Sequence, residues 1–205
     1  MNIAAHLPFS QACENNKQPI LEILQRELVK ASHVLEVGSG TGQHSVHFAP
    51  QLVNLQWQTS DVLANHEGIK AWHAAYPAAN LPAPLAFDLV HDFLPISVNN
   101  QPYDAVFTAN TLHIIGWSLV EQLFTLVGAA LSTEGRFIIY GPFNNGGHYT
   151  SAGNREFDIR LRQGNSDSGI RNKEDVVALA GLHHLTLFAT YKMPANNQLL
   201  IFQKA

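Results

Sequence analysis

Hydrophobic positions along the chain alternate between two spacings, which predict helices and strands in turn. Apolar residues at helical spacing follow Pro19 as far as Leu28, and Pro19 suits the first turn of that helix. Further helical patterns cover residues 42–52, 65–76 and 116–131. Short apolar runs typical of buried strands cover residues 34–37, 55–59, 85–87, 103–108 and 136–140. Strands that alternate with helices predict βαβ units around a mostly parallel sheet, and so the α/β class.

The last third of the chain departs from this alternation. Asn172 is placed to cap a further helix. Two strand-like runs, 185–191 and 198–203, follow it and are joined by the short connection 193–197, which predicts antiparallel pairing. Residues 141–171 exceed the usual length of a connection, so we expect a long irregular loop there. Its aromatic and polar content favours a functional role over disorder.

The segment EVGSGTGQH, Glu36–His44, lies between a predicted strand and a predicted helix. Alternate glycines allow a tight turn and bring main-chain amides close to a ligand at a helix start. The spacing does not fit the G-x-G-x-x-G pattern of nicotinamide and flavin proteins, because Gln43 or Ser45 stands where the third glycine is needed. No Gly-Lys-Ser/Thr follows, which excludes a phosphate-binding P-loop.

With its acidic first position, this turn resembles the first motif of class I S-adenosylmethionine-dependent methyltransferases. The chain as a whole resembles the methyltransferase-like 26 family, which is also a domain-of-unknown-function family. The matching segments are Pro8–Ser10, Asn16–Ile20, Tyr103–Ile115, Tyr140–Asn144, Tyr149–Ser151, Gly169–Arg171 and Met193–Asn197. The resemblance implies a Rossmann-like class I methyltransferase fold. That fold has a seven-stranded, mostly parallel sheet with an antiparallel last strand, and helices on both faces.

The same resemblance implies a site for S-adenosylmethionine, with S-adenosylhomocysteine as the product. Asp61 matches the acid that binds the ribose hydroxyls, and Asp88 matches the position beside the adenine. Plainer interpretations stand beside these two: a solvated Asp61 at a loop end, and an Asp88 that caps a helix. The expected cofactor-binding residues are Glu36, Gly38, Ser39, Gly40, Gly42, His44, Asp61, Asp88 and Asn110.

The catalytic candidates follow the predicted strands, because ligands in open α/β sheets lie beyond the carboxyl ends of parallel strands. We expect Asn110, His113 and Tyr149 to be the catalytic residues, together in one cleft. His113 is the candidate general base, since a free imidazole titrates near a pH of about 6.5. A structural or pocket-lining His113 is an equally open interpretation. Tyr149, His148 and Asn144 are also candidates to line the acceptor pocket.

Composition narrows the set of partners. The chain has 205 residues with 12 basic and 16 acidic side chains, a net charge of −4, and charged residues make up only 14%. With no basic excess, a nucleic-acid partner is not expected. The single cysteine excludes a cysteine-cluster zinc site, and His44 and His47 lack a third ligand nearby, so no metal is expected. Four arginines bracket the same segment: Arg155, Arg160, Arg162 and Arg171. We favour a solvated basic face for them over the binding of an acidic substrate by forked hydrogen bonds.

With these observations, the resemblance implies one methyltransferase domain over residues 1–205, with an N-terminal helical cap at 1–30 and an active-site loop at 141–171. The expected function is S-adenosylmethionine-dependent methyl transfer to a small-molecule acceptor. The alternative is a non-catalytic S-adenosylmethionine-binding protein that acts as a sensor or partner module. With no signal peptide and no apolar stretch of about 18 residues, we expect a cytoplasmic protein without a membrane partner. The oligomeric state is left open.

Overall fold

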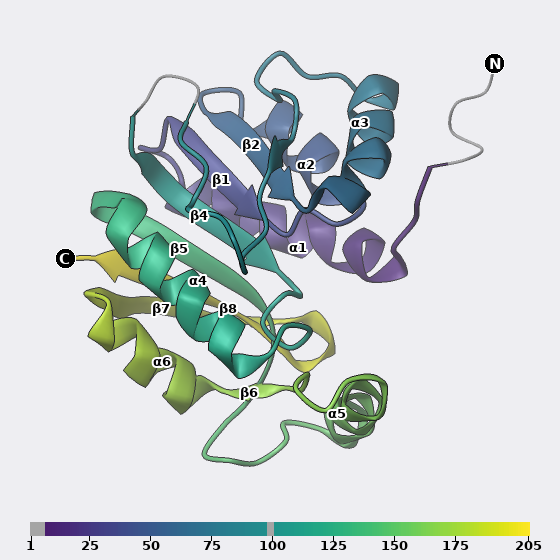
Figure 1. The fold of residues 1–205 in the computed structure, drawn as a ribbon, viewed down its shortest axis with the longest axis vertical. Coiled ribbons are helices and arrows are strands. Elements are labelled where there is room, and N and C mark those ends of the chain that lie inside the picture. The colour runs from purple at the N-terminus through teal and green to yellow at the C-terminus, as the bar shows by residue number, and fades with distance from the viewer. Residues whose placement is uncertain (1–6, 98–100) are drawn as a thin grey trace. The chain divides into compact units, whose positions relative to one another are not determined.

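The computed structural model describes residues 7–97 and 101–205, so residues 1–6 of the expected cap lie outside the described residues. The chain divides into two compact units, one that ends at Phe107 and one that begins at Thr108 (Figure 1). The single domain over 1–205 stays a prediction.

Parallel strands carry the glycine turn in the first unit. The helices are α1 (Gln11–Glu27), α2 (Gln43–Phe48) and α3 (His66–Ala75), with 3-10 turns at Ala49–Gln51 and Leu63–Asn65. The strands are β1 (His33–Val37), β2 (Gln56–Asp61), β3 (Leu85–Ala86) and β4 (Tyr103–Ala109), whose last two residues belong to the second unit. Their order is β3-β2-β1-β4, and each neighbouring pair is parallel. The strands predicted from the apolar runs are therefore confirmed.

Aromatic rings fill the space between α2 and the strands of the first unit. Phe48 of α2 packs edge-on against Trp57 of β2 and Phe107 of β4, with ring centroids 5.2 and 5.8 Å apart. All three side chains are fully buried. Buried aromatic pairs in such geometries add stability beyond the area that they bury, so this cluster fixes α2, and with it the end of the glycine turn, against the sheet.

The second unit is built on antiparallel pairing. Its helices are α4 (Trp117–Ala130), α5 (Ala152–Gly164) and α6 (Lys173–Leu182). Its strands are β5 (Leu131–Asn144), β6 (Arg171–Asn172), β7 (Leu185–Met193) and β8 (Asn197–Lys204), with a 3-10 turn at Pro194–Asn196. The order is β5-β8-β7, both pairs are antiparallel, and β6 pairs with β5 in parallel. The antiparallel pairing predicted for the last two strands is confirmed.

Two packing details shape this unit. The predicted apolar face of α4 is buried, and Phe124 packs against Phe137 of β5 and Phe202 of β8, with centroids 5.0 and 6.0 Å apart. In β7 the register shifts between Leu187 and Ala189, a bulge that leaves Phe188 exposed under the guanidinium of Arg136, 3.6 Å from the ring centroid. The bulge and the cation–π contact both lie on the outermost strand of this unit.

The prediction that Pro19 starts the first helix is wrong. Helix α1 begins eight residues earlier, where the Ser10 hydroxyl accepts a hydrogen bond from Cys13 N, and Pro19 lies inside the helix. The cap satisfies one of the free amide groups of the first turn. Asn16, Ile20 and Leu24 form the buried face of the helix, so packing outweighs the helix-breaking tendency of Pro19.

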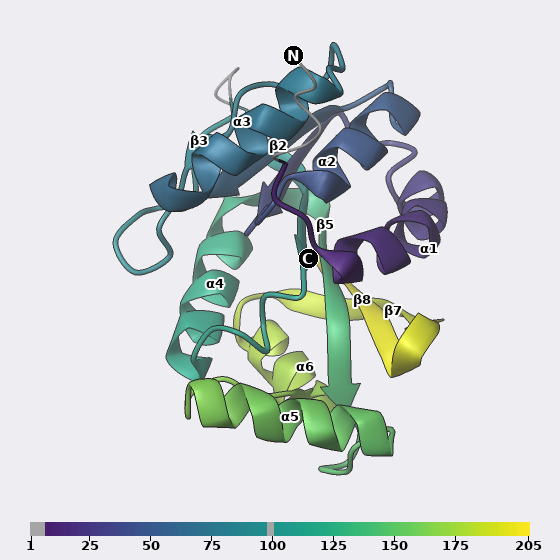
Figure 2. The same ribbon diagram turned by 90° about the vertical axis from the view of Figure 1, so that its right-hand side faces the viewer.

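The prediction of an irregular loop over 141–171 is also wrong. Strand β5 continues to Asn144, α5 occupies residues 152–164, and β6 begins at Arg171. Figure 2 shows α5 across the carboxyl end of β5. An active-site role for residues 141–171 stays a prediction.

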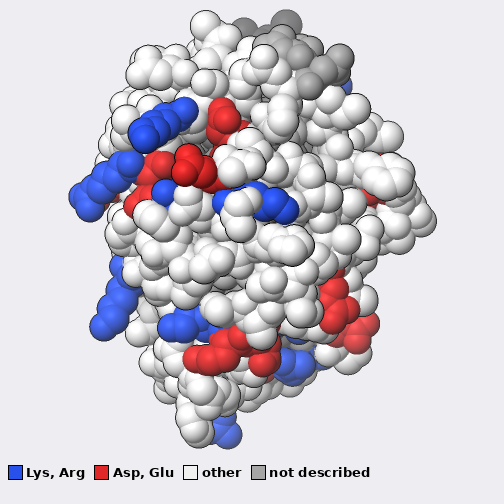
Figure 3. All heavy atoms as spheres, turned by 90° about the vertical axis from the view of Figure 1, so that its left-hand side faces the viewer, with Lys and Arg blue, Asp and Glu red and all other residues white. Residues whose placement is uncertain are grey.

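Charged side chains are sparse. On the face shown in Figure 3, Lys and Arg lie in small groups mixed with Asp and Glu, and uncharged side chains cover most of the area. The described residues include no helix that is long and apolar enough to cross a membrane.

Candidate functional site

The glycine turn between β1 and α2 uses a left-handed backbone at all three predicted glycines. Gly38, Gly40 and Gly42 have φ angles of 71°, 57° and 88°. A Cβ on Gly42 would lie 3.0 Å from the Cα of Ile69 in α3, whereas one on Gly40 would have no described atom within 4 Å. The turn is therefore packed closely against α3 at Gly42 and open at Gly40, which leaves room for a ligand beside the Gly40 backbone.

Asp61, at the end of β2, braces this turn. Its Oδ2 accepts a hydrogen bond from Gly40 N at 2.7 Å, and its Oδ1 accepts from Val62 N at 2.7 Å and from Asn65 Nδ2 at 2.9 Å. A carboxylate offers about four acceptor positions. The bonds to described residues occupy three of these positions, and the expected contact of Asp61 with a ribose hydroxyl stays a prediction.

Ser39 ties the turn to β2. Its hydroxyl donates to the Ser60 carbonyl at 3.4 Å and accepts from Ser60 N at 3.2 Å, while Ser60 Oγ donates to the Glu36 carbonyl at 2.8 Å. The Ser39 side chain is buried. It stabilises the turn itself, and its expected contact with a cofactor stays a prediction.

Glu36 lies beneath the turn as a buried acid. Its Oε2 accepts a hydrogen bond from Trp57 Nε1 at 2.8 Å, and the side chain is 2% exposed. Burial raises the pKa of Glu36 to about 7, while the hydrogen bonds from Trp57 and Ser39 act in the opposite direction. The acid that starts the motif is thus an internal partner of β2, and a role in cofactor binding stays a prediction.

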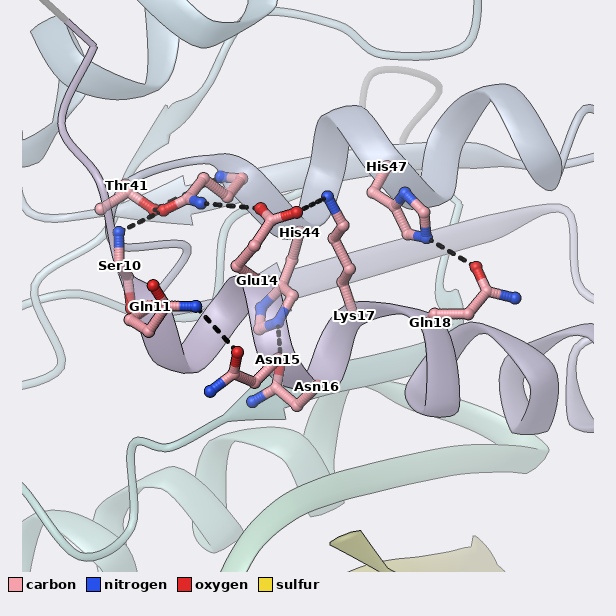
Figure 4. A network of polar contacts seen from close by, with 11 residues as sticks. Ser10, Gln11, Glu14, Asn15, Asn16, Lys17, Gln18, Thr41, His44 and His47 are labelled. Carbon is pink, nitrogen blue, oxygen red and sulfur yellow. Dashed lines mark hydrogen bonds and ion pairs between the residues drawn. The ribbon is translucent and has the colours of Figure 1, made fainter. Parts of the chain in front are cut away.

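Helix α1 is held against the turn and α2 by side chains that point toward one another (Figure 4). Gln43 is the centre of this network: its Oε1 accepts from Ser10 N and from the Thr41 hydroxyl, and its Nε2 donates to Glu14 Oε2 at 3.4 Å. Lys17 forms an ion pair with Glu14. The residue after the last glycine therefore links the turn to the start of α1.

His44 is fully enclosed by protein groups. Its Nε2 lies 2.7 Å from Asn16 Oδ1, and its ring stacks on Phe48 with centroids 5.2 Å apart. Burial lowers the pKa of His44 to about 4, so the ring is neutral at pH 7. These contacts give His44 a structural role, and its cofactor role stays a prediction.

Asp88 follows β3 in a turn. Its Oδ1 accepts from Val90 N at 3.0 Å, and Asp92 Oδ2 accepts from Asp88 N at 2.7 Å. This is the local capping that stood as the plainer interpretation, within a turn and not at the start of a regular helix. Its expected place beside an adenine stays a prediction.

Asn110 and His113 lie in the second unit, directly after β4. Asn110 adopts a left-handed backbone with φ of 59°, and its N–H donates to the Tyr140 carbonyl at 2.9 Å. His113 is 5% exposed, and its ring lies edge-on to Phe157 with centroids 5.4 Å apart. Burial, and then the charge of Arg171, lower the pKa of His113 to about 4. His113 is therefore neutral at pH 7, with one ring nitrogen unprotonated, and is only a weak base.

Tyr149 is exposed, but its hydroxyl is engaged. It donates to Asp158 Oδ2 at 2.7 Å, and this bond raises the pKa of Tyr149. Arg162 donates from Nε to the same oxygen at 2.9 Å, so the Asp158 carboxylate holds both side chains. Arg155 and Arg160 are exposed, as a solvated face predicts.

Asn144, at the carboxyl end of β5, carries a buried polar atom. Its side chain is 8% exposed, and its Oδ1 has no hydrogen-bond partner among the residues that the structure describes. A buried unpaired carbonyl oxygen is costly, so each such atom in a native protein calls for an explanation such as local strain, a catalytic role or a bound water or ion.

Four residues that hold the predicted ones in place were missed from the sequence: Gln43, Trp57, Asp158, and Ser168, whose hydroxyl donates to the Ile114 carbonyl at 2.6 Å. A polar residue next to a motif was the one available signal for Gln43, and none marked the other three. The predicted cofactor residues of the glycine turn and Asp61 come together in the first unit, and Asp88 follows β3 in the same unit. The predicted catalytic residues lie in the second unit. That they lie together in one cleft stays a prediction.

Across residues 7–97 and 101–205, no cluster of three or more His, Cys, Asp or Glu could hold a metal ion.

A family model described as a protein of unknown function, DUF938, matches residues 7–204. Among solved structures, a putative O-methyltransferase from Nostoc punctiforme superposes with a TM-score of 0.79 at 16% identity, over 94% of this chain and 56% of that one. An O-methyltransferase family protein from Burkholderia thailandensis gives 0.77 at 14% identity, over 92% and 56%. Human N-acetylserotonin methyltransferase, solved in complex with S-adenosylmethionine, gives 0.74 at 13% identity, over 92% and 55%.

These likenesses establish the fold. The chain has the mixed, mostly parallel sheet of seven strands with an antiparallel end that is found in class I methyltransferases, as its sequence predicts. It spans a little over half the length of these three proteins.

Proposed function

We propose that this chain, which belongs to the DUF938 family of proteins of unknown function, transfers the methyl group of S-adenosylmethionine to a small-molecule acceptor. The observation that carries the proposal is the glycine turn with Asp61, packed against Ile69 at Gly42 and open at Gly40. In an α/β sheet this turn lies where ligands bind, at the carboxyl end of a parallel strand.

The residues of the turn fit such a cofactor. The left-handed glycines allow the main chain to approach the methionine part closely, and the available acceptor position of Asp61 suits a ribose hydroxyl. When bound, S-adenosylmethionine supplies a methyl group that is already electrophilic on its sulfonium. The protein then needs chiefly to align the methyl group with the acceptor atom.

Two residues of the second unit support a polar acceptor. The unpaired Oδ1 of Asn144 would accept a hydrogen bond from a hydroxyl or amine, which would offset the cost of its burial. The imidazole of His113 is neutral at pH 7, so its unprotonated ring nitrogen can accept the proton that a hydroxyl or amine acceptor would lose, which makes the ring an imidazolium. The net charge of −4 and the mixed surface charges favour a small molecule over a polyanion.

Calorimetry with S-adenosylmethionine, S-adenosylhomocysteine and NAD tests cofactor binding. We expect both S-adenosyl compounds to bind and NAD not to bind. At about 100 times the dissociation constant, the bound ligand should raise the free energy of unfolding by about 2.7 kcal/mol. Wild-type protein that binds neither S-adenosyl compound would exclude the proposed function.

A pair of glycine variants separates binding from stability. Gly40→Ala places a methyl group in the open space and should abolish cofactor binding, at a cost in stability of about 1–2 kcal/mol for the left-handed backbone. Gly42→Ala adds the clash with Ile69 to the same backbone strain, so its larger effect should be on the free energy of unfolding. Retained affinity in a folded Gly40→Ala variant would contradict the assigned site.

Asp61→Ala has a matched control in the same unit. Asp104 Oδ2 accepts from Ser32 N at 2.7 Å and from His33 N at 3.1 Å, so Asp104→Ala also removes a carboxylate that holds backbone amides. We expect Asp61→Ala to weaken S-adenosylhomocysteine binding strongly and Asp104→Ala to leave it within about twofold, a difference of under 0.5 kcal/mol. Equal losses in the two variants would assign Asp61 a purely structural role.

Incubation with methyl-labelled donor and a metabolite extract tests transfer. We expect label in a small polar compound and loss of that label in the His113→Ala variant. Binding of S-adenosylmethionine without labelled product would instead favour the non-catalytic sensor.

A further inference from the structure

The turn that carries His113 is held at four consecutive carbonyl oxygens by one distant segment, Ser168–Arg171. The Leu112 carbonyl accepts from Arg171 Nε at 3.0 Å, and the Ile115 carbonyl accepts from Arg171 Nη2 at 2.5 Å. Between them, the His113 carbonyl accepts from Gly169 N at 2.9 Å and the Ile114 carbonyl from the Ser168 hydroxyl at 2.6 Å.

This segment is itself anchored to α5. Asp158, which is 2% exposed, accepts from Ile170 N on Oδ1 at 2.6 Å, and its Oδ2 accepts from Tyr149 and Arg162. Arg171 Nη2 also donates to the Asp167 carbonyl at 2.8 Å, which closes the segment on itself. An ordinary surface connection does not need a guanidinium spread over three carbonyl groups.

The four carbonyl bonds restrain the backbone that carries the His113 ring. Phe157 lies edge-on to the ring, and a Cβ at Gly141 would approach His113 Nδ1 to 3.6 Å. The charged group that acts on the ring is Arg171, with Asp158, Arg162 and Asp167 behind it in the same network. A small displacement of the turn would change both the burial and the direction of the imidazole.

We propose that Arg171 and Asp158 are positioning residues, which set the orientation and burial of His113 through the backbone of Leu112–Ile115. The significance of this for methyl transfer rests on the proposed function, whereas the positioning of His113 does not. A guanidinium suits this task because its fixed fork of donors can bind several carbonyl oxygens at once, which a lysine ammonium on a flexible stem cannot reproduce.

The experiment is a histidine titration by NMR on the full-length protein labelled with 13C-histidine, with the His113 signal assigned by its loss in His113→Gln. Arg171→Lys keeps the charge but breaks the fork, and Arg171→Gln removes both. Arg160→Lys and Arg160→Gln, on the exposed face of α5, are the matched controls. We expect the pKa of His113 to rise from about 4 toward 6.5 in both Arg171 variants and to stay unchanged in both controls.

The two Arg171 variants distinguish position from charge. A pKa that moves in Arg171→Gln alone would show that Arg171 acts only by its charge, which would overturn the proposal. If both variants have a lower melting temperature but an unchanged His113 titration, Arg171 only stabilises the fold. That result would also overturn the proposal.

Ser168→Ala and Asp158→Asn keep the test decisive if the Arg171 variants do not fold. We expect Ser168→Ala to speed hydrogen exchange of the Gly169 amide about tenfold, as the neighbouring contact loosens, and to shift the His113 titration in the same direction. We expect Asp158→Asn to do the same. If hydrogen exchange of the Gly169 amide and the titration of His113 are both unchanged, the proposed positioning of His113 is refuted. Calorimetry of the wild type with S-adenosylhomocysteine runs beside this, so a failure of the proposed function appears there and not in the titration.

Discussion

Glu36 makes the stability of the protein depend on pH in an unusual direction. Its folded-state pKa of about 7 lies above the value of 4.5 expected in the unfolded chain, so folding favours the protonated acid. Its contribution is fully present below about pH 4.5 and is lost as the pH rises through 7. The loss is on the order of 3 kcal/mol, from roughly 1.4 kcal/mol for each pH unit between the two values.

Glu36→Gln should therefore stabilise the protein more as the pH rises. Glutamine keeps an acceptor for Trp57 Nε1 and has no proton to lose. Buried neutral histidines such as His44 act with the opposite sign below about pH 6.5, but they contribute equally to both proteins. Urea unfolding at pH 5 and pH 8 measures the difference between variant and wild type, with the exposed Glu22→Gln as control. A difference that does not grow with pH would contradict the assignment.

At the scale of residues, sequence reasoning located side chains better than it assigned their partners. The spacing of Gly38, Gly40 and Gly42 was enough to predict the turn, because few residues tolerate that backbone. His44 could not be assigned to Asn16 in the same way, since that contact joins two helices whose docking depends on the whole first unit. The glycine motif is local in the sequence, whereas the contacts that hold it in place join distant segments.

Pro19 offers a direct test at the scale of elements. Inside α1 it cannot donate to the Asn15 carbonyl, and its ring crowds that turn. We expect Pro19→Ala to raise the free energy of unfolding by up to about 3 kcal/mol, because alanine restores the donor and has the best helix propensity. Thermal or urea unfolding measures this, with Gln11→Ala in the first turn as the control. A neutral or destabilising Pro19→Ala would show that the ring is needed for packing.

Among the elements, α5 escaped prediction for a physical reason. Its buried side chains are Asn154 and Asp158, so the helix has no apolar stripe for a hydrophobic pattern to reveal. Its N-cap, Ser151, accepts from Asn154 N at 3.0 Å, and Asp158 pairs with Arg162 one turn later. Helices with apolar faces, such as α4, were predicted almost to the residue.

For the whole molecule, the charge distribution predicts that the protein does not bind polyanions. The net charge is −4, and charges of both signs are mixed on the face seen in Figure 3. We expect no binding to duplex DNA at micromolar protein in about 0.1 M salt, because few phosphates could be neutralised at once. A mobility-shift assay checks this, with a basic DNA-binding protein as positive control. A retarded band would require a basic surface that the charge count does not suggest.

The fold class of the whole molecule was readable from the alternation of 103–108, 116–131 and 136–140 with the earlier runs. Short connections and right-handed crossovers leave few arrangements for such a pattern. The contacts among polar side chains, in contrast, join segments that are far apart in the sequence. The hydrogen bonds from Ser168 and Arg171 to the turn that carries His113 span more than 50 residues. No spacing rule reaches that far.

The bulge in β7 has a consequence for how molecules of this protein meet one another. Of the described strands, β7 borders only β8, and an unpaired strand edge is a template on which another chain can add and aggregate. The shift at Leu187 and Ala189 breaks the regular repeat of free amides along that edge. Arg136 covers the exposed ring of Phe188 with a charge. The irregular edge and the charge over the ring both disfavour the addition of a further strand along β7.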